Sequence, residues 1–545
     1  MFHELSQEDN FVRRFVASAK RCWNSPALDD YRVSSITYGG LMADIERLLA
    51  LWRASGLDKG EKIALNARSS AAWAKVFMAA QVGGYVTVQI FKGFTTADTM
   101  GLVKHSGSRI LYTEKAIFSR MEFDLMPELM AAIDVNTGEL LASRGCFAEV
   151  FAKVDSLYGD AHPDGLKPDD LALPEIGLDD LSAIMYTSGS TGNPKGVMLT
   201  NRNISANLYV IKRHFPYREG ECYVSILPFS HIFGMVYDML VPLSLGMHLV
   251  ILGVPPAPAN LIPAMNVYRP HVFFAVPLVL EKLVDSTVGE YLKSGALPNW
   301  NDLQNIFMQA LGGNVELFAS GGAAIDENLE KLLVKKLRVP FITGYGMTEA
   351  APTITLGDYG DYCLRECGKV QEEVVQVKID SADGAGIPGE ILLKGPVVFK
   401  GYYKNEEATR KAFTSDGWFR TGDVAVMENG KRVFIVGRCK NMILRSNGQN
   451  VFPEEIEVIL NSLPYVAESI VIEKKGRLSA IIVPKSDEVA NDNISAKSLN
   501  GIMQKNIRHL NSRIPAYSAV SGFRIQYEPF AKTPKGTIKR FMYTE

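Results

Sequence analysis

The chain contains 545 residues, of which 47% are hydrophobic and 22% charged, a composition typical of globular proteins with packed cores and not of disordered chains. Its 58 Lys and Arg residues nearly balance 60 Asp and Glu residues, and the net charge of -2 gives no overall field that would attract nucleic acid. This length predicts roughly three or four structural units. The six cysteines show neither zinc-ligand spacing nor a disulfide framework, so we expect a reducing compartment.

The N-terminal residues do not form a targeting signal. Charged side chains at Glu4, Glu8 and Asp9 interrupt the apolar core that a signal peptide needs. No stretch reaches the ~18 consecutive apolar residues of a membrane-spanning helix. We therefore expect a cytoplasmic protein, and peripheral contact with a membrane surface stays open.

Strands and helices are expected to alternate in the first part of the chain. Short apolar runs there are followed by segments that repeat apolar residues at helical spacing. The strands are expected at 63–65, 85–90 and 110–112, the helices at 69–82 and 97–106, and further alternation at 221–227, 271–282 and 317–335. This order predicts an α/β fold with parallel sheets covered by helices.

A loop rich in glycine and hydroxyl side chains follows the strand-like run at 181–186 and precedes a helix expected to begin near Asn201. Because glycine lacks a Cβ atom, successive N–H groups can converge on an anion, as in loops between a strand and a helix that hold phosphates. The alternative is a flexible turn, and a Walker A loop is excluded because no Gly-Lys-Ser/Thr closes the run. The candidate phosphate-binding residues are Thr187, Ser188, Gly189, Ser190, Thr191, Gly192 and Lys195.

The pattern changes after Gly368 to short β-rich runs separated by glycine and proline turns. We expect a large domain at 1–437, whose last part from about 370 to 437 is a β-rich subdomain. A small α+β domain is expected at 438–545, beginning with a hinge and containing a helix from Pro453. It ends in a basic loop at 532–540.

Four further motifs follow the loop. They are Ser320-Gly321-Gly322-Ala323, Gly344-Tyr345-Gly346-Met347-Thr348-Glu349, Gly417-Trp418-Phe419-Arg420-Thr421-Gly422-Asp423 and Gly437-Arg438-Cys439-Lys440-Asn441. In order and approximate spacing, the five motifs resemble those of the adenylate-forming superfamily, which includes acyl-CoA synthetases, firefly luciferase and peptide-synthetase adenylation domains. The runs at 227–234 and 269–277 resemble the long-chain fatty acyl-CoA synthetases within it.

The resemblance implies an ATP-dependent acyl-CoA ligase, an acid–thiol ligase, with a mobile small domain. A fatty acid would attack the α-phosphate of ATP to form acyl-AMP and pyrophosphate, and CoA would then displace AMP. Because two anions must approach each other, the site needs Mg²⁺ and fixed cations. The resemblance therefore implies Mg²⁺ as cofactor and ATP and CoA as co-substrates, with no prediction of the oligomeric state.

The resemblance also implies roles for individual residues. Glu349 would hold Mg²⁺, Thr348 would bind the α-phosphate, and His231 would lie between carboxylate and nucleotide unless it is a packed core histidine. Lys440 would be the hinge, and Gly448 would lie on the face presented to CoA. The residues expected around AMP are Ser320, Gly321, Gly322, Ala323, Gly344, Tyr345, Gly346, Asp423 and Arg438. Those expected around the acyl chain are Phe229, Met235 and Val276.

One motif departs from the family pattern. The family places its adenylation lysine directly after a glycine near the C-terminus, whereas Gly536 is followed here by Thr537. Lys535 precedes that glycine on the same basic loop, and we expect it to be the catalytic lysine. The alternative is that Lys535 is solvated and adenylation is slow or lost.

Two rival functions remain open from the sequence. An acyl-AMP ligase would pass its product to a carrier protein instead of CoA. A non-enzymatic relative would bind acyl groups or nucleotides without forming acyl-AMP.

Overall fold

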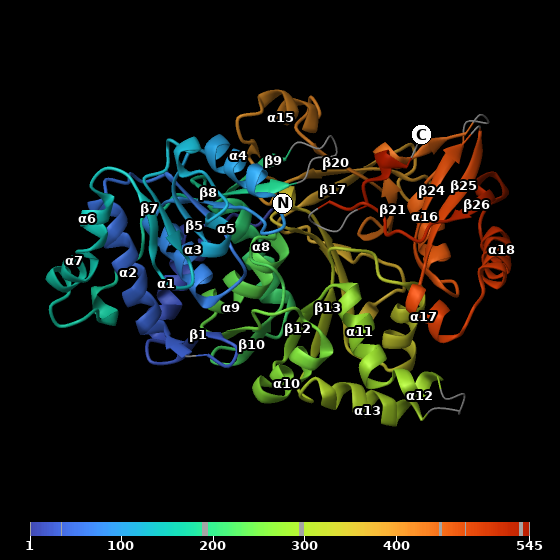
Figure 1. Ribbon diagram of the computed structural model, residues 1–545, viewed down its shortest axis with the longest axis horizontal. Coiled ribbons are helices and arrows are strands. Elements are labelled where there is room, and N and C mark those ends of the chain that lie inside the picture. Colours follow the sequence, from blue (N-terminus) through green and yellow to red (C-terminus); the bar gives the residue numbers. More distant parts are fainter. Residues whose placement is uncertain are drawn as a thin grey trace.

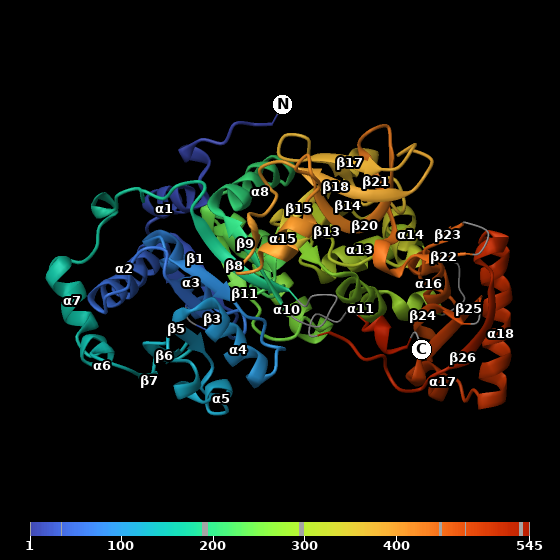
Figure 2. The same cartoon turned by 90° about the horizontal axis from the view of Figure 1, so that it is seen from above.

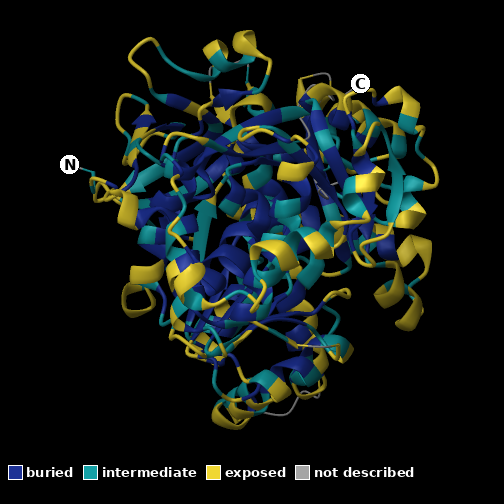
Figure 3. Cartoon of the chain, turned by 90° about the vertical axis from the view of Figure 1, so that its left-hand side faces the viewer, coloured by how far each residue is buried: buried dark blue, intermediate teal, exposed yellow. Residues whose placement is uncertain are grey.

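The structure is a computed structural model, and it describes residues 2–33, 35–187, 194–293, 299–445, 449–474, 476–533 and 538–543. Sheets flanked by helices form the larger part of the molecule, and the C-terminal elements β24, β25, β26 and α18 lie together at one end (Figures 1 and 2). Buried residues lie in the interior of the molecule and exposed residues on its outside (Figure 3).

An eight-stranded sheet carries the N-terminal half of the chain. Its central strands β8, β4, β3, β5 and β6 are parallel, and antiparallel strands close both edges. The central strands are buried on both faces, which explains their continuous apolar runs. In spatial order the strands are β19 (Gly401–Tyr402), β9 (Lys195–Thr200), β8 (Leu181–Thr187), β4 (Val86–Gln89), β3 (Lys62–Asn66), β5 (Ser108–Thr113), β6 (Ala131–Asp134) and β7 (Leu140–Ser143).

A nine-stranded sheet joins the middle of the chain to the β-rich segment. It is parallel from β12 to β14 and antiparallel beyond β14. In spatial order the strands are β12 (Val272–Ala275), β13 (Leu317–Ser320), β14 (Phe341–Gly346), β15 (Thr353–Leu356), β16 (Lys369–Val370), β21 (Arg432–Arg438), β20 (Phe419–Glu428), β18 (Gly389–Lys394) and β17 (Gln376–Asp380). The change of pattern after Gly368 thus marks antiparallel strands added to a parallel sheet.

Two smaller sheets complete the larger part and the C-terminal part. The first consists of β10 (Cys222–Ser225), β11 (His248–Ile251), β1 (Pro26–Asp30) and β2 (Ser35–Thr37). The second consists of β24 (Val466–Lys474), β25 (Arg477–Pro484) and β26 (Val520–Ile525), next to the ribbon of β22 (Ile443–Leu444) and β23 (Asn450–Val451). A separate apolar core lies between this C-terminal sheet and its helices α16 and α18.

Helices cover the sheets, and a π-helical segment, Gly234–Leu240, leads into α9. The helices of the larger part are α1 (Phe11–Arg21), α2 (Tyr38–Ala54), α3 (Ala71–Gly83), α4 (Thr96–Ser106), α5 (Lys115–Phe118), α6 (Phe147–Phe151), α7 (Val154–Ala161), α8 (Asn201–His214), α9 (Val241–Ser244), α10 (Pro258–Tyr268), α11 (Pro277–Thr287), α12 (Gly289–Lys293), α13 (Trp300–Ala310), α14 (Glu327–Lys331) and α15 (Glu406–Ala412). The C-terminal part has α16 (Pro453–Asn461), α17 (Ser486–Asn491) and α18 (Ala496–Arg513). No helix among the described residues is long and apolar enough to cross a bilayer.

The predicted fold class, an α/β protein with a β-rich segment and a small C-terminal α+β unit, is confirmed. Helix α8 begins at Asn201, as expected. Strand β9 at residues 195–200, however, was not predicted; it pairs antiparallel with β8 and lies between the loop and the helix. The apolar run Val197-Met198-Leu199 belongs to this strand, so α8 does not begin directly after the loop.

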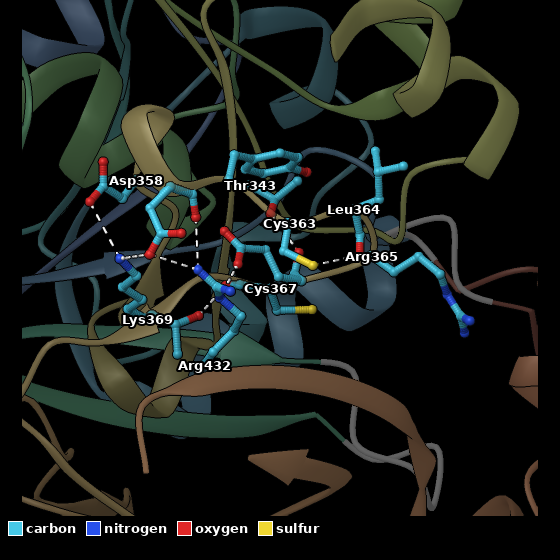
Figure 4. Close-up of polar contacts among 12 residues, drawn as sticks. Thr343, Asp358, Cys363, Leu364, Arg365, Cys367, Lys369 and Arg432 are labelled. Atoms are coloured by element: carbon cyan, nitrogen blue, oxygen red, sulfur yellow. Dashed lines mark hydrogen bonds and ion pairs between the residues drawn. The ribbon is translucent and has the colours of Figure 1, made fainter. Parts of the chain in front are cut away.

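A buried ion pair fixes the connection between β15 and β16 (Figure 4). The carboxylate of Glu366 is fully buried and lies 2.6 Å from Nε of Arg432 on β21. The carbonyl of Glu366 accepts a hydrogen bond of 2.7 Å from the hydroxyl of Thr343, and the carbonyl of Cys367 accepts one from Thr355. Because Thr343 and Thr355 lie on β14 and β15, the ion pair holds this connection against both strands.

Burial raises the pKa of Glu366 from 4.5 to about 7. Between these two pH values the folded protein therefore keeps a proton on Glu366 that the unfolded chain has lost. The ionisation of Glu366 therefore lowers the free energy of unfolding as the pH rises from 4.5 to about 7. We expect Glu366→Gln to remove up to about 3 kcal/mol of this loss, so that its thermal unfolding midpoint falls less than that of the wild type between about pH 5 and pH 8. Glu372→Gln, at an exposed carboxylate, is the control. Equal pH dependence in all three proteins would contradict the assignment.

Candidate active site

A cavity of about 170 Å³ opens at the C-terminal ends of β12, β13 and β14, against the π-helical segment. One part of its lining, the aromatic side, is a cluster formed by Phe215, Phe233, Tyr237 and Phe274. The remainder, the glycine-rich side, consists mainly of glycine-rich turns and polar residues, and it touches the aromatic cluster where Phe233 lies against Gly321 and Gly322. Of the residues that the sequence assigns to the site, this cavity brings together His231, Ser320, Gly321, Gly322, Gly344, Tyr345, Gly346 and Thr348.

The glycine-rich side of the cavity depends on close approach of backbone segments. A Cβ atom on Gly346 would lie inside the van der Waals radius of the Pro352 carbonyl oxygen. A Cβ atom on Gly344 would lie 3.2 Å from the carbonyl oxygen of Thr355, and one on Gly321 would lie 3.2 Å from that of Gly344. Glycine is therefore required by packing at the end of β14. Ala323, in contrast, is exposed and is not among the described residues that line the cavity.

Tyr345 is linked to Asp423, far along the chain, and through it to Arg438. Its hydroxyl donates a hydrogen bond of 2.8 Å to Oδ2 of Asp423, and Nε of Arg438 lies 2.8 Å from Oδ1 of the same carboxylate. The register of β20 and β21 places Asp423 directly opposite Arg438. Burial raises the pKa of Asp423, although Arg438 opposes this shift. The three predicted AMP-binding residues therefore form one connected group.

Ser320 at the end of β13 has an unusual environment. Its side chain is buried and lines the cavity, yet Oγ has no hydrogen-bond partner among the described residues. A buried hydroxyl without a partner costs free energy unless a ligand or water completes it. Ser320 is thus an available donor and acceptor inside the cavity.

Glu349 and Lys195 both contact Tyr402, a residue that was not predicted from the sequence. The hydroxyl of Tyr402 donates a hydrogen bond of 3.0 Å to Oε1 of Glu349, which is largely buried. The ammonium of Lys195 lies 4.8 Å from the centre of the Tyr402 ring. Lys195 pairs with Thr187 across the hairpin, so both flank the glycine-rich loop. Tyr402 belongs to the two-residue strand β19, and a Gly-Tyr-Tyr turn offered no recognisable sequence signal.

Three groups of predicted site residues lie outside the described part of the chain. They are Ser188, Gly189, Ser190, Thr191 and Gly192 of the loop, Gly448, and Lys535 with its neighbour Thr537. Lys440 is described and is exposed in a short turn between β21 and β22. Two basic residues near Lys535 in the sequence form ion pairs. Lys532 is paired with Glu468, and Arg540 is paired with Glu457.

The residues predicted around the acyl chain are not among the described residues that line the cavity. Phe229 and Met235 are fully buried, and Val276 is half-buried. Phe229 packs on Trp73 with ring centroids 5.5 Å apart, and Sδ of Met235 lies 3.3 Å from Nε2 of Gln89. The described lining residues include Phe233 and Tyr237 in place of these three. Tyr237 was missed because it lies in an apolar run that reads as core.

Known proteins resemble this chain over most of its length. It is 26% identical to the long-chain-fatty-acid–CoA ligase FadD15 of Mycobacterium bovis over 465 residues, which are 78% of this chain and 73% of the relative. It is 27% identical to 4-coumarate–CoA ligase 5 of Oryza sativa subsp. japonica over 82% of this chain and 79% of the relative. The solved structure of the anthranilate CoA ligase AuaEII with anthranoyl-AMP has the same fold, with a TM-score of 0.78, 20% identity and coverage of 98% and 96% of the two chains.

Family comparison agrees with these relatives. Residues 15–403 match the AMP-binding enzyme family, and residues 440–545 match the AMP-binding enzyme C-terminal domain. The two matches together span most of the chain, and the motif at 417–423 with Asp423 falls between them. The chain therefore belongs to the AMP-binding enzyme family, as its sequence motifs predict.

Proposed function

We propose that this AMP-forming acid–thiol ligase activates a long-chain fatty acid with ATP and transfers the acyl group to CoA. The observation that carries the proposal is that the cavity lining combines polar, glycine-rich turns with a cluster of aromatic rings. An acyl-AMP combines the same two characters, with a nucleotide at one end and an apolar chain at the other. The runs at 227–234 and 269–277 and the relative FadD15 support the long-chain acid.

On this proposal the polar side binds AMP. Tyr345 offers a ring face to adenine, and the carboxylate of Asp423, held by Tyr345 and Arg438, keeps lone pairs for the ribose hydroxyls. Thr348 and the unpartnered hydroxyl of Ser320 supply hydrogen bonds within the cavity. Donors fixed in place before the reaction stabilise charge in the transition state better than mobile ones.

Glu349 would hold Mg²⁺ at the edge of this site. The described residues contain no cluster of three or more Asp, Glu, His or Cys side chains that could bind a metal ion by themselves. A single buried carboxylate, oriented by Tyr402, fits an ion that takes its other ligands from phosphates and water, as Mg²⁺ does. The bound ion would neutralise phosphate charge as the carboxylate approaches.

The acyl chain would enter on the aromatic side, between Phe233 and Tyr237. The cavity of about 170 Å³ is smaller than the roughly 300 Å³ at which pockets for organic ligands begin. Any acyl-AMP therefore requires the lining to move apart, and a long acyl chain requires more room than a short one.

A panel of carboxylic acids from acetate to oleate tests the function. AMP release is followed with ATP and Mg²⁺, with and without CoA. We expect the highest kcat/KM for the long-chain acids and turnover that requires CoA. ATP–pyrophosphate exchange without acyl-CoA formation would select the acyl-AMP ligase that loads a carrier protein. Nucleotide binding without exchange for any acid would select a non-enzymatic binder.

Glu349→Gln separates the two half-reactions. The amide keeps the shape of the side chain but loses the negative charge that would hold Mg²⁺, so acyl-AMP formation should fall by about tenfold to a thousandfold and need more Mg²⁺. Thioester formation from supplied acyl-AMP should change much less. Tyr402→Phe, which removes only the hydrogen bond to Glu349, should have a smaller effect in the same direction. Equal losses in both half-reactions would assign Glu349 a structural role.

The basic loop that lacks the family lysine allows a second test that separates the two half-reactions. Lys532 and Arg540 are already paired with acidic residues of the C-terminal part, so Lys535 is the better candidate for the cation beside the carboxylate and α-phosphate. Lys535→Ala should abolish acyl-AMP formation and spare CoA transfer from supplied acyl-AMP, whereas Thr537→Lys should help little, since the position of the charge matters more than its amount. Single-turnover assays measure both steps. A large gain in Thr537→Lys with no loss in Lys535→Ala would refute this assignment.

A further inference from the structure

A buried carboxylate lies directly behind the aromatic side of the cavity. Asp238 belongs to the π-helical segment Gly234–Leu240, and its side chain is fully buried. No Lys, Arg or His of the described residues forms an ion pair with it. Burial raises its pKa to about 6, so the group is ionised at neutral pH and must be stabilised by hydrogen bonds alone.

Four donors converge on this carboxylate. The hydroxyl of Tyr223 donates to Oδ1 at 2.6 Å, and the hydroxyl of Ser225 donates to Oδ2 at 3.1 Å. The backbone N–H groups of Ile226 and Leu227 donate to Oδ2 at 2.9 and 2.8 Å. The two N–H groups follow the end of β10, where no neighbouring strand continues the ladder beyond Ser225. Asp238 therefore takes the place of that ladder at the start of the next loop.

That loop and the helical run that follows it form one wall of the cavity. The loop runs from Ile226 to His231, and the helical run begins at Ile232 and becomes π-helical at Gly234, where a Cβ atom would overlap the Pro228 carbonyl oxygen. The N–H of His231 donates to the Pro228 carbonyl at 3.0 Å, which tightens the turn. His231, Ile232 and Phe233 all line the cavity. The position of these side chains thus depends on how the loop is fastened at Asp238.

The residue before Asp238 forms the other part of the aromatic wall. Tyr237 lines the cavity, and its hydroxyl lies 2.7 Å from Oγ1 of Thr353. Its ring centroid lies 5.1 Å from that of Phe233 and 4.8 Å from that of Phe274. Phe233 and Tyr237 lie four positions apart on one continuous helical run, and Asp238 joins this run to the end of β10 and to the loop that follows it.

We propose that Asp238 is a positioning residue that sets the selectivity of the enzyme for its acyl substrate by holding the helical run that carries Phe233 and Tyr237 against the end of β10 and the loop at 226–231. Asp238 does not contact the substrate. It fixes the position of the Phe233 and Tyr237 rings relative to the rest of the cavity wall, and that position limits which acyl chains can enter. This inference rests on the proposed function.

Asp238→Asn tests the inference because the amide keeps the shape but turns one acceptor into a donor that faces other donors. We expect KM for the preferred acid to rise at least tenfold and the preference among chain lengths to flatten. KM for ATP and CoA transfer from supplied acyl-AMP should change by less than about twofold, because the polar side is untouched. Tyr223→Phe removes one of the four donors and should shift KM in the same direction by a smaller factor.

Asp134→Asn is the matched control. Asp134 is also buried and also accepts backbone hydrogen bonds, from Lys115 at 2.6 Å and from Asn136 and Thr137 at 2.9 Å, but it lies on β6 in the other large sheet. It should leave the chain-length profile unchanged. If Asp238→Asn does not fold, Tyr223→Phe carries the test.

The outcomes separate the inference from the function on which it rests. Wild-type enzyme that activates no fatty acid would overturn the proposed function, and the inference with it. Wild-type enzyme that is active, with Asp238→Asn and Tyr223→Phe retaining its KM and its chain-length profile, would overturn the inference alone. A flattened profile in Asp134→Asn as large as in Asp238→Asn would also overturn it, since the effect would then belong to any buried aspartate.

Discussion

The site depends on the backbone of β14, which passes so close to neighbouring backbone segments that only glycine fits there. At Gly346 a Cβ atom would overlap the Pro352 carbonyl oxygen, and at Gly344 it would lie 3.2 Å from the Thr355 carbonyl oxygen. This contact brings the turn that carries Thr348 and Glu349 back over the strand. It also directs Tyr345 toward Asp423, which comes from the antiparallel part of the sheet. One close approach therefore assembles residues that are far apart in the chain.

Buried polar groups hold the walls of the cavity from behind. Glu366 and Arg432 fasten the segment to which Thr343 and Thr355 are bonded, and Asp238 fastens the loop of His231 to the π-helical segment. Such groups are costly to bury and specify one arrangement only when all their partners are present. The hydrophobic core gives the molecule its stability, whereas these polar contacts decide where the cavity residues stand.

Much of the fold followed from the sequence, and the reasons for success and failure are local. Helix α8 was expected to begin near Asn201 and begins there, because the preceding Thr200 caps it and apolar residues repeat at helical spacing. Strand β9 was not predicted, because the glycine-rich run before it was interpreted as a loop that leads to the helix. Glycine-rich motifs identified the polar side of the cavity because close backbone approach leaves a mark in sequence. Tyr402 and Asp238 leave no such mark, since their roles arise only from long-range contacts.

The central claim is that one cavity binds the nucleotide on its glycine-rich side and the acyl chain on its aromatic side. A crystal structure of the protein with a non-hydrolysable acyl-AMP analogue that carries a long chain tests it most directly. The account predicts adenine against Tyr345, ribose hydroxyls at Asp423 and the start of the chain between Phe233 and Tyr237, with those two rings moved apart. An analogue bound with its chain directed away from the Phe233 and Tyr237 rings, or bound outside this cavity, would contradict it.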